Sequence, residues 1–136
     1  MATMTMQGLI LFAHGARDPR WAAPFEAVAR QILQQQPELK LRLAYLELMT
    51  PSLQDAGAEL CAAGCRQVDV LPMFLGTGGH LRKDLPPMMD RLRELHPSVC
   101  WRLHAAVGEQ PHVREAMAAT ALALLTEPDA AQGAGS

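Results

Sequence analysis

Short runs of apolar residues alternate along this chain with longer segments in which apolar residues recur at helical spacing. Residues 9–13 form an unbroken apolar run and residues 68–74 an almost unbroken one, which is typical of strands buried on both faces. Residues 41–47 and 99–103 are two further candidate strands, and the last alternates more with polar residues, as an edge strand does. The sequence therefore predicts a sheet of four strands connected by helices.

The first two helices are expected between the first three candidate strands. Apolar residues recur at helical spacing over residues 21–33, and Pro37 follows as a helix breaker. Thr50 and Pro51 have the form of an N-cap and a first helical position, and Gly64 is the predicted C-terminal stop of that helix.

Two more helices complete the pattern. Asp84 is the predicted N-cap of the third, where Pro86 and Pro87 are tolerated because amides of the first turn have no partner within the helix. The fourth is expected over residues 111–125, with Val113, Met117, Ala121 and Leu124 on one apolar face.

The length and the order of elements indicate one α/β domain. A chain of 136 residues that is 49% hydrophobic is long enough for one core, and a second domain is not expected. Alternating strands and helices predict a three-layer domain over residues 1–126, with a four-stranded parallel sheet flanked by helices on both faces. Residues 127–136 are small, polar and glycine-rich, and we expect a disordered tail there.

Charge and hydropathy argue against several classes of partner. The formal net charge is -2, from 12 basic and 14 acidic side chains, so no attraction for nucleic acid is expected. The N-terminus lacks the features of a signal peptide, and no apolar run approaches the ~18 residues needed to cross a bilayer. We therefore expect a cytoplasmic protein without a membrane partner, whose thiols at Cys61, Cys65 and Cys100 are reduced and lie in the core.

Two histidines follow the ends of candidate strands. In an open parallel sheet with strand order 2-1-3-4, the ligand crevice lies beyond the carboxyl ends of the first and third strands. His14 follows the first strand directly and His80 follows the third through a glycine-rich loop, so both are expected at this crevice. Glu47, at the end of the second strand, can reach it too.

These residue types suit an exchangeable metal ion. Neutral imidazole binds Co²⁺, Ni²⁺ and Fe²⁺ well, and two imidazoles with a carboxylate leave coordination positions open. A histidine titrates near neutrality and can also accept protons that a metal displaces from another ligand. The other histidines, His96, His104 and His112, lack this setting and are expected to be surface or helix-end residues.

The loop between the third strand and His80 has the sequence Gly-Thr-Gly-Gly over residues 76–79. Glycines allow the backbone to approach a flat ligand closely and to present amides to carboxylates. Arg17, Arg82 and Lys83 flank the histidines and can pair with an acidic ligand, although solvated surface charge is the commoner role. A phosphate or nucleotide site is the weaker interpretation, because GxxxxGK[ST] and GxGxxG patterns are absent.

An ordered set of segments resembles a known family. The segments are LFAHGARD at residues 11–18, LELMTPSL at 46–53, LPMFLGTGGH at 71–80 and VGEQP at 107–111. Together they resemble the small sirohydrochlorin chelatases of the CbiX type over residues 8–125. The resemblance implies a chelatase-like (flavodoxin-like) fold and a class II, ATP-independent chelatase. Such an enzyme inserts Co²⁺, or in relatives Fe²⁺, into sirohydrochlorin in cobalamin or siroheme synthesis.

The resemblance also implies roles for individual residues. His14 would be a metal ligand and proton acceptor, and His80 the second metal ligand. The substrate-binding residues would be Arg17, Glu47, Leu75, Gly76, Thr77, Gly78, Gly79 and His80. Ala16 departs from the serine common in the family at this position, so a hydrogen bond from that hydroxyl is lost.

The partners implied are an acidic tetrapyrrole of the sirohydrochlorin type and a second copy of the chain. No organic cofactor is expected, and the divalent metal, Co²⁺ or alternatively Fe²⁺ or Ni²⁺, is a substrate. Larger relatives contain two such units in one chain, so a single unit suggests a homodimer. A cobalt or nickel carrier that uses the same histidines without catalysis remains the alternative.

Overall fold

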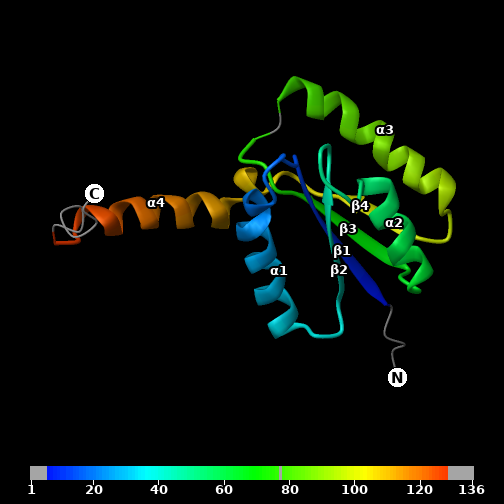
Figure 1. The fold of residues 1–136 in the computed structure, drawn as a ribbon, viewed down its shortest axis with the longest axis horizontal. Coiled ribbons are helices and arrows are strands. Elements are labelled where there is room, and N and C mark those ends of the chain that lie inside the picture. The colour runs from blue at the N-terminus through cyan, green and yellow to red at the C-terminus, as the bar shows by residue number, and fades with distance from the viewer. Residues whose placement is uncertain (1–5, 77, 129–136) are drawn as a thin grey trace.

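Four parallel strands form one sheet in the order β2-β1-β3-β4, as Figure 1 shows. The computed structural model describes residues 6–76 and 78–128, and of His80 it describes the backbone alone. The single α/β domain with a four-stranded parallel sheet is therefore confirmed, whereas the expected disorder of the tail falls mostly on residues 129–136, outside the described part. The strands are β1 (Gln7–Ala13), β2 (Lys40–Tyr45), β3 (Gln67–Pro72) and β4 (Cys100–Leu103).

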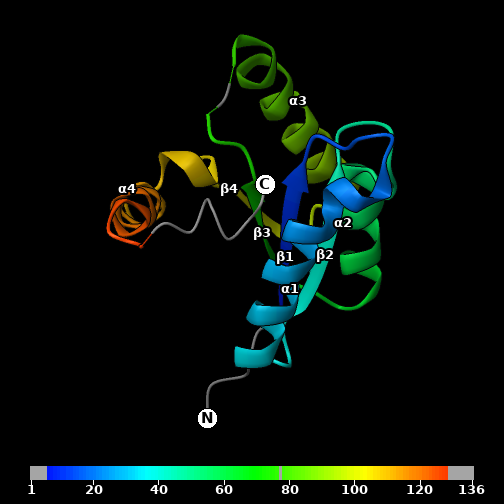
Figure 2. The same cartoon turned by 60° about the vertical axis from the view of Figure 1, so that its left-hand side comes forward.

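Helices lie on both faces of the sheet (Figures 1 and 2). One face is covered by α1, and the other by α2 and α3. Along each central strand, neighbouring residues therefore enter different cores, Leu11 towards α1 and Phe12 towards α2 and α3. The helical elements are η1 (Pro19–Ala22), α1 (Ala23–Gln35), α2 (Leu53–Ala62), α3 (Gly79–Leu95), η2 (Val107–Glu109) and α4 (Pro111–Leu125).

The predicted start of α2 was wrong by two residues. Ser52, not Thr50, is the N-cap, because its extended backbone and its Oγ, which accepts from the amide of Asp55 at 3.1 Å, satisfy the first turn. The predicted stop is confirmed: Gly64, just after the helix, has a φ of +96°.

The predicted start of α3 was also wrong. The helix begins at Gly79, ahead of Asp84, and its first turn closes through the amide of Arg82, which donates to the carbonyl of Gly78 at 3.1 Å. Pro86 and Pro87 consequently lie inside the helix and leave two carbonyls of the preceding turn without helical donors. Those carbonyls belong to exposed residues, so water can replace the missing donors.

The fourth helix has the predicted bounds but not the expected place. α4 projects away from the sheet in Figure 1 and is seen nearly end-on beside it in Figure 2, and none of its residues is buried. On the α1 side of the sheet, a fourth helix would have to pack against β3 and β4. These strands carry Asp69 and Arg102 there, and the two charged side chains form an ion pair. Packing an apolar helix there is unfavourable, because the helix would bury both charges.

Among the described residues, no helix is long and apolar enough to span a membrane.

Candidate functional site

His14 lies directly beyond the carboxyl end of β1. Strands β1 and β3 pair with Phe12 opposite Pro72, and the amide of Met73 donates to the carbonyl of Phe12 at 2.7 Å. The same register, continued by two residues, brings His14 opposite Phe74, where the ring centroids are 4.4 Å apart. Phe74 is only 4% exposed, whereas His14 is exposed. A buried aromatic ring thus supports an imidazole that remains accessible to a ligand.

The loops after β1 and β2 are joined at their backbones, which places Glu47 next to His14. The amide of Glu47 donates to the carbonyl of His14 at 3.0 Å, beside a similar bond of 2.9 Å from Leu46 to Ala13. Gly15 makes this approach possible: its φ is +95°, and a Cβ there would lie 1.8 Å from the carbonyl oxygen of Glu47. The side chain of Glu47 is exposed, so the structure brings these two predicted residues to one edge of the sheet.

The glycine-rich loop before α3 lies at the same end of the sheet (Figure 1). A Cβ added to Gly76, Gly78 or Gly79 would meet no atom within 4 Å, and none of the three has a positive φ that would favour glycine. Neither packing nor backbone conformation therefore requires glycine at these positions, and the side facing their missing Cβ atoms is open to a ligand. Thr77 and the side chain of His80 are outside the described part of the chain.

Both ends of that loop contact residues of η2. Gly108 is buried, its amide donates to the carbonyl of Phe74 at 2.9 Å, and a Cβ on it would lie 1.9 Å from the carbonyl oxygen of Leu75. The neighbouring Glu109 accepts from the amide of Ala106 at 3.3 Å and lies 3.9 Å from the guanidinium of Arg82 in the first turn of α3. These contacts tie both ends of the loop to one short helix.

Exposed apolar side chains border the site. Outside α4, the most exposed large hydrophobic residues are Leu75 at 74% and Leu48 at 60%, among those described. Leu75 follows Phe74, and Leu48 follows Glu47 in a left-handed conformation with a φ of 68° that non-glycine residues rarely adopt. Both leucines are thus held at the edge that carries His14. Such a rim suits the flat apolar face of a ligand.

The predicted cations are present around the site. Arg17 is exposed three residues beyond His14, and Lys83 is exposed in α3. Among the side chains that the structure describes, no group of three or more His, Cys, Asp or Glu residues is close enough to hold a metal ion. Of the predicted metal-binding side chains, the described part of the structure contains His14 and Glu47, and these two do not by themselves enclose a metal ion.

Other polar groups lie away from this edge. His96 follows α3, His112 is in the first turn of α4, and the ring of His104 pairs with Asp69 at 2.7 Å. Burial alone would raise the pKa of Asp69, but hydrogen bonds from Arg102, His104 and Gln67 outweigh it and lower that pKa. Cys65 is buried and Cys61 half-buried, as expected, whereas Cys100 is exposed and the prediction of a core thiol there was wrong.

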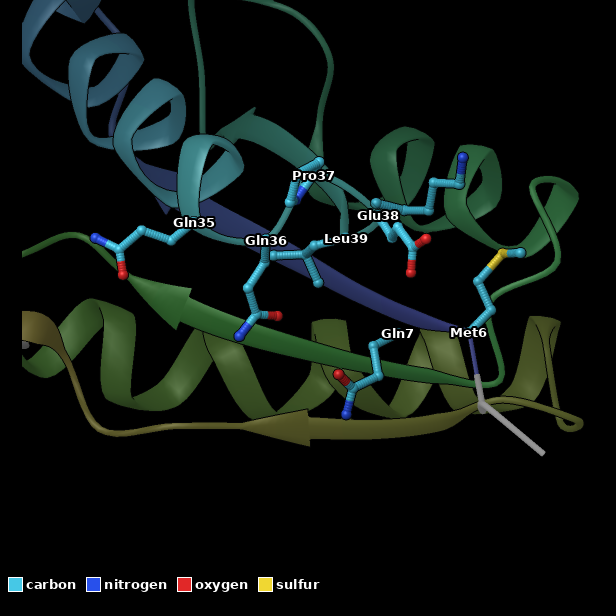
Figure 3. A pocket seen from close by; sticks show the side chains of 8 residues that line it. Met6, Gln7, Gln35, Gln36, Pro37, Glu38 and Leu39 are labelled. Carbon is cyan, nitrogen blue, oxygen red and sulfur yellow. The ribbon is translucent and has the colours of Figure 1, made fainter. Parts of the chain in front are cut away.

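Figure 3 shows a hollow at the amino ends of the strands, opposite to His14. It lies between the end of α1 and the starts of β1 and β2, and Glu38 and Lys40 supply its only charged side chains among the lining residues described. It holds neither a histidine nor a cysteine among those residues, so it offers none of the metal-binding chemistry of the opposite edge.

The sequence analysis did not identify Phe74, Leu48 or the close contact between the backbones of Gly108 and Leu75. The apolar run at residues 68–74 placed Phe74 inside the third strand, whereas β3 ends at Pro72. Only the pairing register, continued beyond the strand, shows that Phe74 lies against His14. A glycine after three apolar residues gives no sign of the backbone that it will contact. The exposed leucines carry a weak signal, since both follow strand ends that also carry candidate ligands.

Comparison with known proteins identifies related chains. The sequence model of the CbiX family matches residues 8–123. The "sirohydrochlorin cobaltochelatase" of Saccharolobus solfataricus is 31% identical over 84 residues, which cover 62% of this chain and 64% of that protein. The protein of the same name from Methanosarcina acetivorans is 27% identical over 82 residues, covering 60% and 63%. The matches thus span less than two thirds of the length of these curated relatives.

Solved structures show the same fold. A putative cobalamin biosynthesis CbiX protein from Marinobacter aquaeolei superposes with a TM-score of 0.76 at 35% identity, over 88% of this chain and 97% of that one. SirB from Bacillus subtilis, solved with Fe³⁺, superposes with a TM-score of 0.69 at 22% identity, over 82% of this chain and 44% of that one.

Proposed function

The chain belongs to the CbiX family, and we propose that it inserts a divalent metal ion into sirohydrochlorin without ATP. Co²⁺ is the proposed metal, because the curated relatives are named cobaltochelatases, and Fe²⁺ is the alternative. A structure of the distant SirB was solved in complex with cobalt and another with Fe³⁺, so this fold accommodates both elements. The product would enter cobalamin or siroheme synthesis.

In this proposal His14 binds the incoming metal and accepts a proton from the macrocycle. Insertion removes two pyrrole N–H protons, and histidine suits such a transfer because it titrates near neutrality. The observation that carries the proposal is the exposed imidazole of His14, which lies against buried Phe74 while its backbone carbonyl accepts from the amide of Glu47. His80 is proposed as the second metal ligand, and Glu47 as a further metal or substrate contact.

The macrocycle is proposed to lie between the rim leucines and the loop. Leu48 and Leu75 offer apolar surface to its flat face, while Gly76, Gly78 and Gly79 leave room for close approach of the backbone. Loop amides and Arg17 are proposed to bind its carboxylates, because charge-assisted hydrogen bonds to carboxylates are stronger than neutral ones. Leu75, Thr77 and His80 complete the proposed lining of the loop.

We also propose that the working unit is a homodimer in the cytoplasm. Single-unit chains resemble half of a larger two-unit relative, and this chain covers 44% of SirB. The competing proposal is a metal carrier, which would bind Co²⁺ or Ni²⁺ stoichiometrically at the same histidines. Only the chelatase requires a macrocycle site next to the metal ligands, which the open glycine loop supports.

The test is the visible absorption of sirohydrochlorin mixed anaerobically with catalytic amounts of the protein and either Co²⁺ or Fe²⁺. Each rate is compared with a protein-free mixture and with His14→Ala, which should fold normally because His14 is exposed. Multiple turnovers that His14→Ala abolishes would support the chelatase. Bound metal without acceleration would favour the carrier, and full turnover by a folded His14→Ala variant would remove His14 from the mechanism.

A further inference from the structure

The first turn of α3 has little stabilisation of its own. Its N-cap is Gly78, which has no side chain that could accept hydrogen bonds from the first amides. Residues 79–81 include no acidic side chain, whereas Arg82 and Lys83 put two positive charges close to the helix start. Because the amino end of a helix carries a partial positive charge, these cations oppose helix formation there. The turn therefore depends on contacts with other parts of the chain.

Two such contacts lie on different sides of the turn. Leu81 is buried, with 6% of its surface exposed, in the core that α2 and α3 form with the sheet. Arg82 follows about 100° further round the helix, and its guanidinium lies 3.9 Å from the carboxylate of Glu109. Leu81 alone would fix one side of the turn and leave it able to rotate about that contact. Together the two contacts fix the rotation of the turn, and with it the orientation of the backbone at residue 80.

Glu109 is itself held in place. One of its carboxylate oxygens accepts from the amide of Ala106 at 3.3 Å, and the other is the one that faces Arg82. The neighbouring Gly108 donates its amide to the carbonyl of Phe74 at 2.9 Å. The side chain of Glu109 is 33% exposed, so its charge is screened less than that of a fully solvated glutamate. A carboxylate on a short helix that is fixed to the end of β3 thus reaches the start of α3.

The same short helix, η2, contacts both halves of the proposed metal site. Phe74, whose carbonyl accepts a hydrogen bond from η2, also supports the ring of His14. The turn that Glu109 reaches carries the proposed second ligand. We propose that Glu109 is a positioning residue that acts through Arg82 to hold the first turn of α3, and with it His80, at the metal site. The inference rests on the proposed function for the role of His80, whereas the anchoring of the turn does not.

Capping of η2 does not by itself require the charge of Glu109. A glutamine at this position could accept from the amide of Ala106 through its side-chain oxygen, whereas only a carboxylate neutralises Arg82. Glu109→Gln therefore keeps the local role of the residue and removes the one proposed here.

Hydrogen–deuterium exchange, followed by mass spectrometry of peptides that cover residues 79–85 of the metal-free full chain, tests the anchoring. Glu109→Gln should speed up this exchange about two- to fivefold, the effect of losing one exposed ion pair, and leave peptides of β3 unchanged. The matched control is Glu59→Gln, which removes a carboxylate that pairs with Arg42 of β2 at 2.9 Å and should not affect these peptides. Unchanged exchange in Glu109→Gln would overturn the proposal.

A double-mutant cycle tests whether the effect passes through Arg82. In an Arg82→Gln background, Glu109→Gln should change the exchange of residues 79–85 far less than in the parent chain, because no cation remains at position 82. Equal effects in both backgrounds would show that Glu109 acts on the turn by another route, and would overturn the proposed one.

Cobalt tests the link to the metal site. Because His80 is the proposed second ligand, saturating Co²⁺ should hold the turn in place of Glu109 and restore slow exchange in Glu109→Gln. By the same linkage, calorimetry should show weaker Co²⁺ binding by this variant than by the parent, by up to about the same two- to fivefold. Faster exchange in the variant that Co²⁺ does not slow would support the anchoring of the turn and remove His80 from the proposed metal site.

Discussion

The ring of His14 lies against the ring of Phe74, with centroids 4.4 Å apart and planes tilted by 48°. Both residues follow directly from the pairing of β1 with β3, since each stands two positions beyond the paired residues Phe12 and Pro72. The most buried part of the fold therefore determines where the exposed imidazole lies. This relationship makes Phe74 a positioning residue for the chemistry proposed at His14.

Replacing Phe74 should impair turnover more than stability. Phe74→Leu keeps most of the buried volume and should cost about 1 kcal/mol in the free energy of unfolding, measured by urea titration. The imidazole loses its flat support, so kcat of cobalt insertion should fall roughly ten- to hundredfold, with a smaller change in KM. Phe12→Leu is the control, because the ring of Phe12 lies edge-on to Phe74 in the same core, whereas the ring that lies against His14 is that of Phe74. Equal losses of kcat in both variants would contradict the positioning role.

Alanine substitution should affect two glycines of the site differently: stability should fall at Gly108, and substrate binding should weaken at Gly76. Gly108→Ala forces a Cβ into the backbone of Leu75 and should lower stability by about 1–3 kcal/mol through overpacking. Gly76→Ala meets no atom within 4 Å and should leave the melting temperature unchanged, yet raise KM for sirohydrochlorin because the methyl occupies the ligand side. Thermal denaturation gives the melting temperature of each variant, and steady-state kinetics gives its KM for sirohydrochlorin. An unchanged KM in Gly76→Ala would mean that the macrocycle does not approach this part of the loop.

The Asp69 carboxylate should stabilise the fold in a pH-dependent way. Its pKa lies below the ordinary value of 3.8, so the ionised form favours the folded state, and this contribution is lost as the pH falls through the lowered pKa. Asp69→Asn should therefore be less stable than the parent at pH 7, by about 1–2 kcal/mol, and the difference should shrink below about pH 4. Denaturant titrations at several pH values measure this. A difference that persists undiminished at low pH would assign the effect to packing.

Arg17 should act on the substrate and not on the metal. Arg17→Ala should raise KM for sirohydrochlorin about fivefold, which corresponds to ~1 kcal/mol for an exposed charge pair, and the increase should diminish at high salt. Metal affinity, measured by calorimetry with Co²⁺ alone, should be unchanged. Arg20→Ala is a suitable control, because Arg20 is exposed nearby but pairs with Asp18. A selective loss of Co²⁺ affinity in Arg17→Ala would reverse the assignment.

Much of the fold could be predicted from local patterns. Residues buried on both faces leave unbroken apolar runs, so β1 and β3 were located, and the more alternating segment was correctly assigned to the edge as β4. Helix starts were less accurate, because an N-cap depends on which nearby side chain meets a free amide. At α2 that side chain is Ser52 instead of Thr50.

The candidate site was predictable in part. The positions of His14 and Glu47 beyond adjacent strands follow from topology, and the structure brings their backbones together. Phe74 and Gly108 were not predictable, because their roles come from register and from contact with residues distant in sequence. The assignment of His80 and Thr77 to metal and substrate remains a prediction.

The sequence by itself determined the four strands, their parallel arrangement and the end of the sheet at which His14 lies, because burial and chain connectivity leave a periodic record in the residues. The strand order 2-1-3-4 was expected as the common one for such a sheet, and the structure confirms it. It also determined the bounds of α4, whose helical propensity is local. Only the tertiary structure decided that α4 leaves the sheet and that Gly15 and Gly108 join distant loops. Those outcomes depend on which surfaces meet, such as the charged face at Asp69 and Arg102, and that is a property of the assembled chain.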